Sequence, residues 1–213
     1  MSREQMLRDV RLALGRKPGQ EIPALPPVRL AIPQVPVRQR IDSMLERVAA
    51  LAGKTLHAKS QAEAREYVAA VIRDKTAVTS NAPFLRECGI TELPGVRSGV
   101  TDREELRALC ATSSYGISSA DYGLSDTGSL VMISSHDEAR LVSLLPPAHI
   151  AVVPASKLLT GLDELYSLRP RPADGTSSMV FITGPSRTAD IEQILVRGVH
   201  GPGEIHVVVV DGI

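Results

Sequence analysis

Thiol ligands for a redox or metal centre are scarce in this chain of 213 residues. Its two cysteines, Cys88 and Cys110, lie far apart and in no Cys-x-x-Cys arrangement, and no histidine has metal-ligand spacing. An iron–sulfur cluster or a structural zinc ion typically needs about four closely spaced thiolate or imidazole ligands. The sequence therefore predicts no metal site and no bound cofactor, with both cysteines reduced and buried in the core.

Net charge, aromatic residues and long apolar runs are also lacking. Basic and acidic residues number 24 each, so no global field attracts nucleic acid or an anionic membrane. Aromatics make up 3% of the chain and Trp is absent, which excludes a base-stacking surface. No apolar run approaches the roughly 18 residues of a membrane helix, and the charged N-terminus is unlike a secretory signal. We expect a cytoplasmic protein with neither a nucleic-acid nor a membrane partner.

The beginning of the chain differs in pattern from the rest. Residues 2–14 are expected to form an amphipathic helix, because Ser2 and Gln5 match a capping box and apolar residues recur on one face. The first 36 residues also contain six prolines, which favour an extended strap after the helix. Since such a short helix is marginal alone, it should pack on the main domain, a second copy or another subunit. The predicted organisation is an arm at 1–36 and a domain at 37–213.

In the predicted domain, short apolar runs alternate with helical periodicities, which is typical of an α/β fold with a mostly parallel, Rossmann-like sheet covered by helices. The expected strands lie near residues 55–57, 76–79, 115–119, 129–134, 150–153, 179–183 and 205–210. The expected helices lie near residues 41–53, 61–73, 84–87 and 101–110.

The first candidate functional segment runs from Ala120 to Val131 and contains Asp121 and Asp126-Thr127-Gly128. Asp-Thr-Gly is typical of a turn between strands, and this interpretation fully explains the glycine. It does not require two carboxylates. At a strand end they could instead act as acid and base, or bind a polar substrate.

The second candidate segment, residues 181–192, is expected to be a strand, a small-residue turn and a helix. Backbone N–H groups at the helix start, with nearby hydroxyls and a guanidinium, would form an anion site. Its candidate residues are Gly184, Ser186, Arg187, Thr188 and Asp190. Alternatively, Thr188 or Asp190 merely caps the helix and Arg187 is solvated. It is not a nucleotide P-loop, and no Gly-x-Gly-x-x-Gly occurs in the chain.

A glycine-rich loop with His200 and Gly201 follows this segment and leads into the last strand. Histidine exchanges protons near neutral pH, although a lone histidine is more often structural or simply exposed. Strand ends on one side of an open α/β sheet share a crevice, so both candidate segments and His200 are expected to converge there.

These motifs resemble the lactate-utilisation (LUD) domain family. The resemblance covers about residues 37–213 and rests on Ala120-Asp121, Asp126-Thr127-Gly128, Leu144-Leu145-Pro146, His149-Ile150, Thr183 to Glu192 and Gly198 to Pro202. It implies a fold similar to the glucosamine-phosphate deaminase, ribose-phosphate isomerase and CoA-transferase group. It also implies a role in oxidising L-lactate to pyruvate, with the iron–sulfur clusters on two partner proteins. Where the family has Glu-Thr-Gly, this chain has Asp126, one methylene shorter, which puts a carried-over catalytic role in doubt.

Three functions follow as expectations. The first is a cluster-free accessory subunit of a lactate-oxidising complex, which binds a small carboxylate or supports its partners. Here Arg187 and its turn, with Thr127, Gly128 and Gly201, hold the carboxylate, and Asp126 or His200 handles a proton. The second is an independent enzyme acting on a phosphate ester or an acyl-CoA, and the third is a structural or regulatory module.

Overall fold

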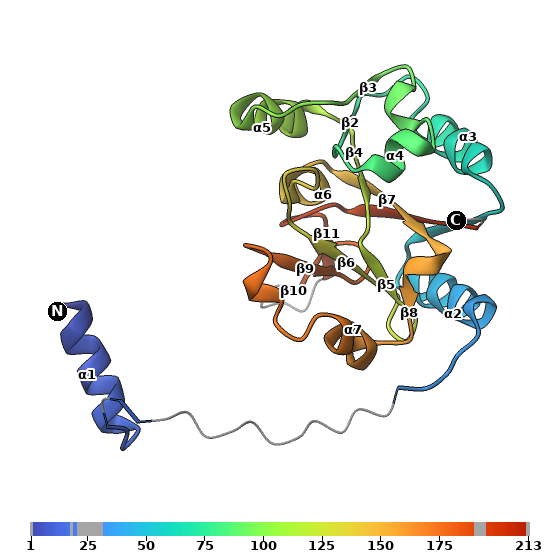
Figure 1. The fold of residues 1–213 in the computed structure, drawn as a ribbon. Helices are drawn as coiled ribbons and strands as arrows, with labels where there is room; N and C mark the ends of the chain where they lie inside the picture. Colours follow the sequence, from blue (N-terminus) through green and yellow to red (C-terminus); the bar gives the residue numbers. More distant parts are fainter. Residues whose placement is uncertain (1, 18, 21–31, 190–194, 212–213) are drawn as a thin grey trace. The chain divides into compact units, whose positions relative to one another are not determined.

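The computed structural model describes residues 2–17, 19–20, 32–189 and 195–211. It separates into two compact units, Met1–Leu30 and Ala31–Ile213, which are described one at a time (Figure 1). Among the described residues, no helix is both long and apolar enough to cross a membrane.

The first unit contains the helix α1 (Arg3–Ala13), as the sequence predicts. The hydroxyl of Ser2 accepts a hydrogen bond from the backbone N–H of Gln5, which caps the helix. No residue of α1 is buried, and apolar side chains such as Met6 and Val10 are exposed. Where the helix packs stays a prediction, and most of the proline strap lies outside the described residues.

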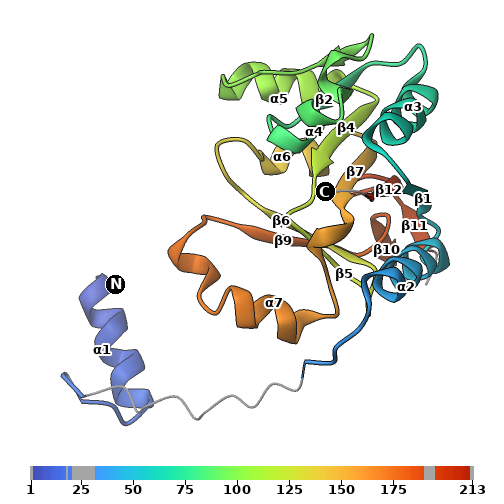
Figure 2. The ribbon, with the colours of Figure 1, turned by 45° about the vertical axis from the view of Figure 1, so that its right-hand side comes forward.

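The second unit is built on a six-stranded parallel sheet, which confirms the predicted α/β class (Figures 1 and 2). Its strands, in spatial order, are β1 (Lys54–Ala58), β12 (Glu204–Val210), β7 (Ala148–Pro154), β4 (Tyr115–Ser119), β2 (Ala77–Thr79) and β3 (Val96–Arg97). The central strands β12 and β7 are almost wholly buried, as expected for strands covered on both faces.

One face of this sheet is covered by α3 (Gln61–Ile72) and α4 (Pro83–Glu87), followed by the short helix η1 (Ile90–Glu92). Successive side chains of a strand point to opposite faces. Val208 and Val210 of β12 therefore join this core.

The other face is covered by α2 (Val37–Ala50) and by a smaller four-stranded sheet. Val207 and Val209 of β12 pack into this second core, together with Met44 of α2. The smaller sheet has the spatial order β8 (Leu158–Leu159), β5 (Tyr122–Leu124), β6 (Ser129–Ile133) and β9 (Met179–Ile182). Beside β4 and β2, α5 (Arg103–Thr112) and α6 (Arg140–Leu144) form a separate cluster with Val78.

Two expectations for the fold need correction. The strands near 129–134 and 179–183 exist, but they pair antiparallel in the smaller sheet rather than joining the parallel one. The helix expected after residue 186 is wrong, because β10 (Arg187–Ala189) pairs antiparallel with β11 (Leu195–Arg197). Cross-strand pairing of Thr188 with Val196 explains the difference, since β-branched residues favour strands.

The remaining elements are short: η2 (Ala155–Lys157) links β7 to β8, and α7 (Leu162–Leu168) and η3 (Pro172–Asp174) link β8 to β9. Through α7, Arg40 of α2 is tied to the smaller sheet, donating to the backbone of Leu158 and to the Glu164 carboxylate. This link fixes α2 against the segment that follows β7.

Candidate functional site

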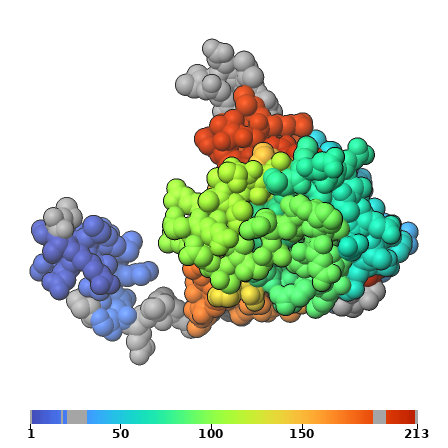
Figure 3. All heavy atoms as spheres, turned by 90° about the horizontal axis from the view of Figure 1, so that it is seen from above, coloured from blue at the N-terminus to red at the C-terminus, as the bar shows by residue number. Residues whose placement is uncertain are grey.

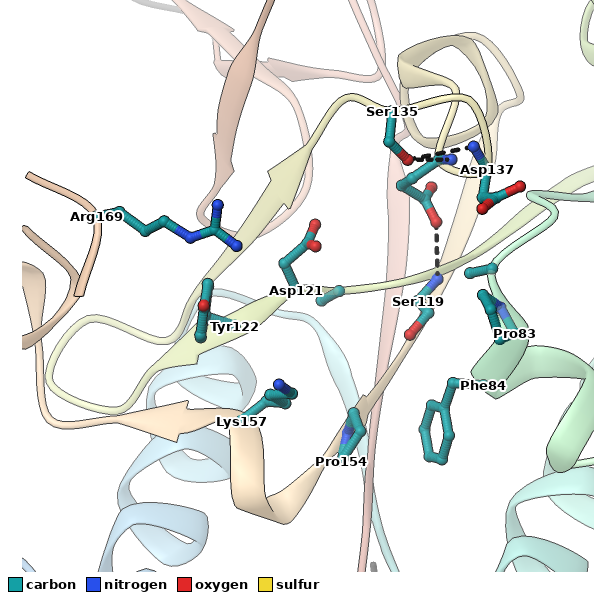
Figure 4. A pocket seen from close by; sticks show the side chains of 13 residues that line it. Pro83, Phe84, Ser119, Asp121, Tyr122, Ser135, Asp137, Pro154, Lys157 and Arg169 are labelled. Carbon is teal, nitrogen blue, oxygen red and sulfur yellow. Dashed lines mark hydrogen bonds between the residues drawn. The ribbon is translucent and has the colours of Figure 1, made fainter. Parts of the chain in front are cut away.

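The carboxyl ends of β2, β4 and β7 lie at one edge of the parallel sheet, because these strands are parallel neighbours. After these ends, the chain enters α4, β5 and η2 respectively, so the three segments diverge. Between them lies a cavity of about 290 Å³, called here the strand-end crevice (Figure 4). A cleft at the carboxyl ends of the strands is where open α/β sheets bind ligands.

Five acidic or basic side chains line the strand-end crevice: Asp121, Asp137, Glu138, Lys157 and Arg169. They come from different parts of the chain, and all follow the end of a strand or a helix. The β4–β5 connection supplies Asp121, the segment after β6 supplies Asp137 and Glu138, η2 supplies Lys157 and the end of α7 supplies Arg169. The fold therefore gathers both signs of charge in a small volume.

Glu138 is the most buried of these groups, with 6% of its surface exposed. The hydroxyl of Ser135 accepts the backbone N–H groups of Asp137 and Glu138, at 3.2 and 3.0 Å, and fixes the turn that carries the carboxyl group. One oxygen, Oε2, accepts the N–H of Ser119 at 3.4 Å. Among the described residues the other oxygen, Oε1, has no hydrogen-bond partner.

The pKa of Glu138 is raised to about 8, chiefly because the side chain is buried. Hydrogen bonds with Ser80 and Ser119 lower this pKa, and the negative charges of Asp121 and Asp137 raise it, both to a smaller extent than burial. At neutral pH the side chain is therefore mostly protonated. A protonated carboxyl group can donate a hydrogen bond as well as accept one. Glu138 thus supplies a neutral proton donor at the wall of the crevice.

Asp121 lies in the same crevice but in a different environment. Its Oδ2 accepts the backbone N–H of Ile133 at 2.7 Å. The pKa of Asp121 is raised overall, because the effect of burial is larger than the lowering by this hydrogen bond and by the charges of Arg169 and Lys157. In Figure 4 the guanidinium of Arg169 extends toward the Asp121 carboxylate.

Neither cation of the crevice forms a salt bridge with any residue that the structure describes. The ammonium of Lys157 lies 5.9 Å from the centre of the Tyr122 ring, and Arg169 follows the C-terminus of α7. Both cations are therefore available to hold an anion. The described residues contain no group of three potential metal ligands.

The arrangement suits a small carboxylic acid that carries a second oxygen. A guanidinium binds a carboxylate with two parallel hydrogen bonds. The protonated Glu138 can donate to a hydroxyl or keto oxygen on the adjacent carbon, and Asp121 can accept a hydroxyl proton. The crevice thus combines charge recognition with a proton donor and a proton acceptor.

The predicted segment Asp126-Thr127-Gly128 forms the turn between β5 and β6, outside this crevice. Gly128 has a φ of 71° and its Cα lies against Arg47 of α2, which agrees with the turn interpretation. Asp126 is exposed, and its carboxylate lies against Gly161. The hydroxyl of Thr127 contacts the Ser129 hydroxyl at 2.8 Å, and that hydroxyl in turn contacts Thr183 at 2.7 Å.

The second predicted segment lies beside the C-terminal end of α2. Gly184, with a φ of 78°, packs against Leu51, and the guanidinium of Arg187 donates to the carbonyl oxygen of Leu51. Arg187 thus satisfies a free carbonyl group at the end of a helix. The backbone N–H of Ser186 donates to Pro202, and Gly201 packs beside the Ser186 side chain.

The structure therefore brings the Asp126–Gly128 turn and the second predicted segment together, but at the end of α2. The loop with His200 and Gly201 precedes β12, so it lies at the amino ends of the parallel strands. The expected convergence of His200 with the strand-end crevice is wrong, and so is the helix start that would have held an anion. Thr188 lies in β10, and Asp190 lies outside the described residues. The catalytic and binding roles of all these residues stay predictions.

Of the predicted residues that the structure describes, only Asp121 lines the crevice. The sequence reasoning missed Glu138, Lys157 and Arg169. Lys157 follows a predicted strand end, which was an available signal. Glu138 follows Ser135 in a polar stretch that resembles any exposed turn, and nothing local indicates its burial. Arg169 reaches the site only through the fold of the β8–β9 connection.

Comparisons with known proteins agree with the fold and the motifs. A family model described as the LUD domain matches residues 41–210. "Lactate utilization protein C" of Halalkalibacterium halodurans is 39% identical over 136 residues, covering 60% of this chain and 59% of that protein. The protein of the same name in Bacillus subtilis is 40% identical over 103 residues, covering 46% of this chain and 43% of that protein. The matched regions thus span about half the length of these relatives.

A solved structure has a similar fold. It is the crystal structure of a DUF162 family protein from Deinococcus radiodurans, with a TM-score of 0.61 and 18% sequence identity. The match covers 83% of this chain and 99% of that one, and at this identity it concerns the fold alone.

Proposed function

Because the chain belongs to the LUD domain family, and its relatives are named for lactate utilisation, we propose that it is a cluster-free subunit of a cytoplasmic system that oxidises L-lactate to pyruvate. Its part is to bind the small carboxylate in the strand-end crevice. The iron–sulfur clusters that accept the electrons belong to partner proteins.

The observation that carries this proposal is the pairing of free cations with a neutral carboxyl group in one crevice. Arg169 and Lys157 would hold the carboxylate of lactate or pyruvate. The protonated Glu138 would donate to the oxygen on the neighbouring carbon, and Asp121 would accept the hydroxyl proton of lactate. The contacts of Glu138 and Asp121 with the oxygen on the second carbon would distinguish a 2-hydroxy or 2-keto acid from a simple carboxylic acid, which lacks that oxygen.

The electrons released by lactate oxidation support the assignment of iron–sulfur clusters to partner proteins. Oxidation of lactate to pyruvate releases two electrons and two protons, so an electron acceptor is required. Both cysteines of this chain are buried and unpaired. Burial raises the pKa of each thiol to about 11, which disfavours the thiolate that binds iron.

A thermal-shift experiment tests where the carboxylate binds. We compare the wild type, Arg169→Gln and Arg187→Gln in the presence of L-lactate, pyruvate and propionate, because a ligand of the folded state raises its stability. Each substitution removes one exposed arginine, so each variant controls for the other's change in net charge.

We expect lactate and pyruvate to stabilise the wild type, and propionate to stabilise it less. This stabilisation should be lost in Arg169→Gln and kept in Arg187→Gln. Loss in Arg187→Gln alone would move the site to the end of α2. Stabilisation of the wild type by neither lactate nor pyruvate would contradict the proposal.

A further inference from the structure

A second and larger hollow adjoins the strand-end crevice. It lies between α5, α6 and the segments flanking β6 and β9, and its volume is about 1040 Å³. We call it the α5–α6 groove. Figure 3 looks onto the end of the body where α5 (green) lies at the surface.

Three arginines line the α5–α6 groove: Arg103 and Arg107 from α5, and Arg140 from α6. Arg103 and Arg107 are four residues apart, so they lie on the same side of their helix. Arg140 donates a hydrogen bond of 3.4 Å to the hydroxyl of Ser178, which directs it across the groove. None of the three forms a salt bridge with a described residue, so their positive charges are not neutralised within that part of the chain.

The α5–α6 groove also has an apolar wall, formed by leucines of α6 and its C-terminal end. Leu141, Leu144 and Leu145 all line it and are each at least 36% exposed. Three large apolar side chains at the surface beside unpaired arginines favour a ligand that is both anionic and partly apolar.

Glu138 is common to the α5–α6 groove and the strand-end crevice, together with Ser135. Its Oε1, without a partner among the described residues, belongs to a buried side chain at the boundary between the two. The two hollows therefore meet at Glu138 and Ser135.

We propose that the α5–α6 groove binds an organic phosphate, with the phosphate groups on Arg103, Arg107 and Arg140 and the organic part on the leucines. Guanidinium groups match phosphate oxygens in geometry and charge. Three arginines lining one hollow indicate a ligand with more than one negative charge, which a single carboxylate does not supply. A hollow that reaches a buried side chain is also more typical of a small-molecule site than of a flat protein interface.

This inference is independent of lactate binding, because the arginines and leucines of the α5–α6 groove take no part in the strand-end crevice. It gives the protein a second ligand, whose bound position would adjoin the carboxylate through Glu138.

Calorimetric titration with ADP, inorganic pyrophosphate and adenosine tests the proposal. ADP carries two phosphate groups and an aromatic base whose flat face can pack on leucine side chains, whereas pyrophosphate lacks the base and adenosine lacks the phosphates. The variants are Arg107→Gln and Leu144→Ala, and Arg86→Gln on α4 is the control, since it removes an exposed arginine outside the α5–α6 groove.

We expect ADP to bind more tightly than pyrophosphate, and adenosine to bind more weakly than ADP. Arg107→Gln should weaken ADP and pyrophosphate about tenfold, as loss of one charge-assisted contact does. Leu144→Ala should weaken ADP but not pyrophosphate, and Arg86→Gln should change neither by more than about twofold. Absence of ADP and pyrophosphate binding at millimolar concentration would overturn the proposal. Equal weakening by Arg107→Gln and Arg86→Gln would overturn it too, because only a non-specific charge effect would remain.

Discussion

The substitution Glu138→Gln tests the unusual proton affinity on which the crevice chemistry depends. In the folded protein the pKa of Glu138 is about 8, whereas its ordinary value is 4.5. Between these pH values the folded protein holds a proton that the unfolded chain has released. Wild-type stability should therefore fall as the pH rises from about 4.5, and this contribution should level off above about 8.

The size of the effect follows from the interval between the two pKa values. At about 1.4 kcal/mol for each pH unit, full ionisation of Glu138 would lower the free energy of unfolding by about 5 kcal/mol. This is an upper value, because the folded state can relax around the charge. Glutamine has nearly the same shape as the protonated acid and does not ionise, so Glu138→Gln should abolish this pH dependence.

The assay is urea unfolding followed by circular dichroism at pH 5, 7 and 9. We expect Glu138→Gln to match the wild type at pH 5 and to exceed it by about 2–5 kcal/mol at pH 9. The control is Glu66→Gln, which neutralises an exposed carboxylate of α3 and should differ from the wild type by a constant, small amount. Parallel pH profiles for the wild type and Glu138→Gln would refute the reasoning.

Three other predictions concern the framework around the site. Arg40→Ala removes a guanidinium that is largely buried between α2, β8 and α7. The free energy of unfolding, measured in urea, should therefore fall by about 2–4 kcal/mol. A decrease below about 0.5 kcal/mol would contradict this. Gly116→Ala would place a methyl group against a backbone carbonyl of α6 and should lower the free energy of unfolding by about 2–3 kcal/mol. The control Gly175→Ala adds its methyl group in open space and should be nearly neutral. Similar effects of the two substitutions would show that β4 and α6 are not in close contact. Cys88 and Cys110 should react with a thiol reagent at pH 8 only after unfolding in urea, because burial raises the pKa of both; rapid reaction of the native protein would argue against their burial.

Much of the fold could be predicted from the sequence, because apolar periodicity is a local signal. The run at β12 is buried on both faces, and capping residues such as Ser60 mark true helix starts. The smaller sheet could not be predicted, since β5 and β8 are short and their pairing joins residues far apart in the chain. The sequence predicts a helix start where β10 pairs with β11, because small polar residues such as those at 186–188 suit either structure.

The site was less predictable than the fold. The sequence predicts the turn at Gly128 and a carboxylate near a strand end at Asp121, and the structure has both features. Glu138 could not be distinguished from neighbouring acidic residues, because its burial results from packing between β4 and the segment after β6. The position of His200 depends on strand direction: its loop precedes β12, and loops before parallel strands lie opposite the crevice.

The central claim is that the strand-end crevice binds a small carboxylate through Arg169 and a protonated Glu138. Calorimetric titration with pyruvate at pH 6, 7, 8 and 9 tests it most directly, in the wild type, Arg169→Gln and Glu138→Gln. We expect the affinity of the wild type for pyruvate to fall as the pH passes about 8, the pKa of Glu138. Glu138→Gln should remove this fall, and Arg169→Gln should weaken pyruvate binding about tenfold at every pH. Pyruvate binding that is equally tight in all three proteins and independent of pH would contradict it.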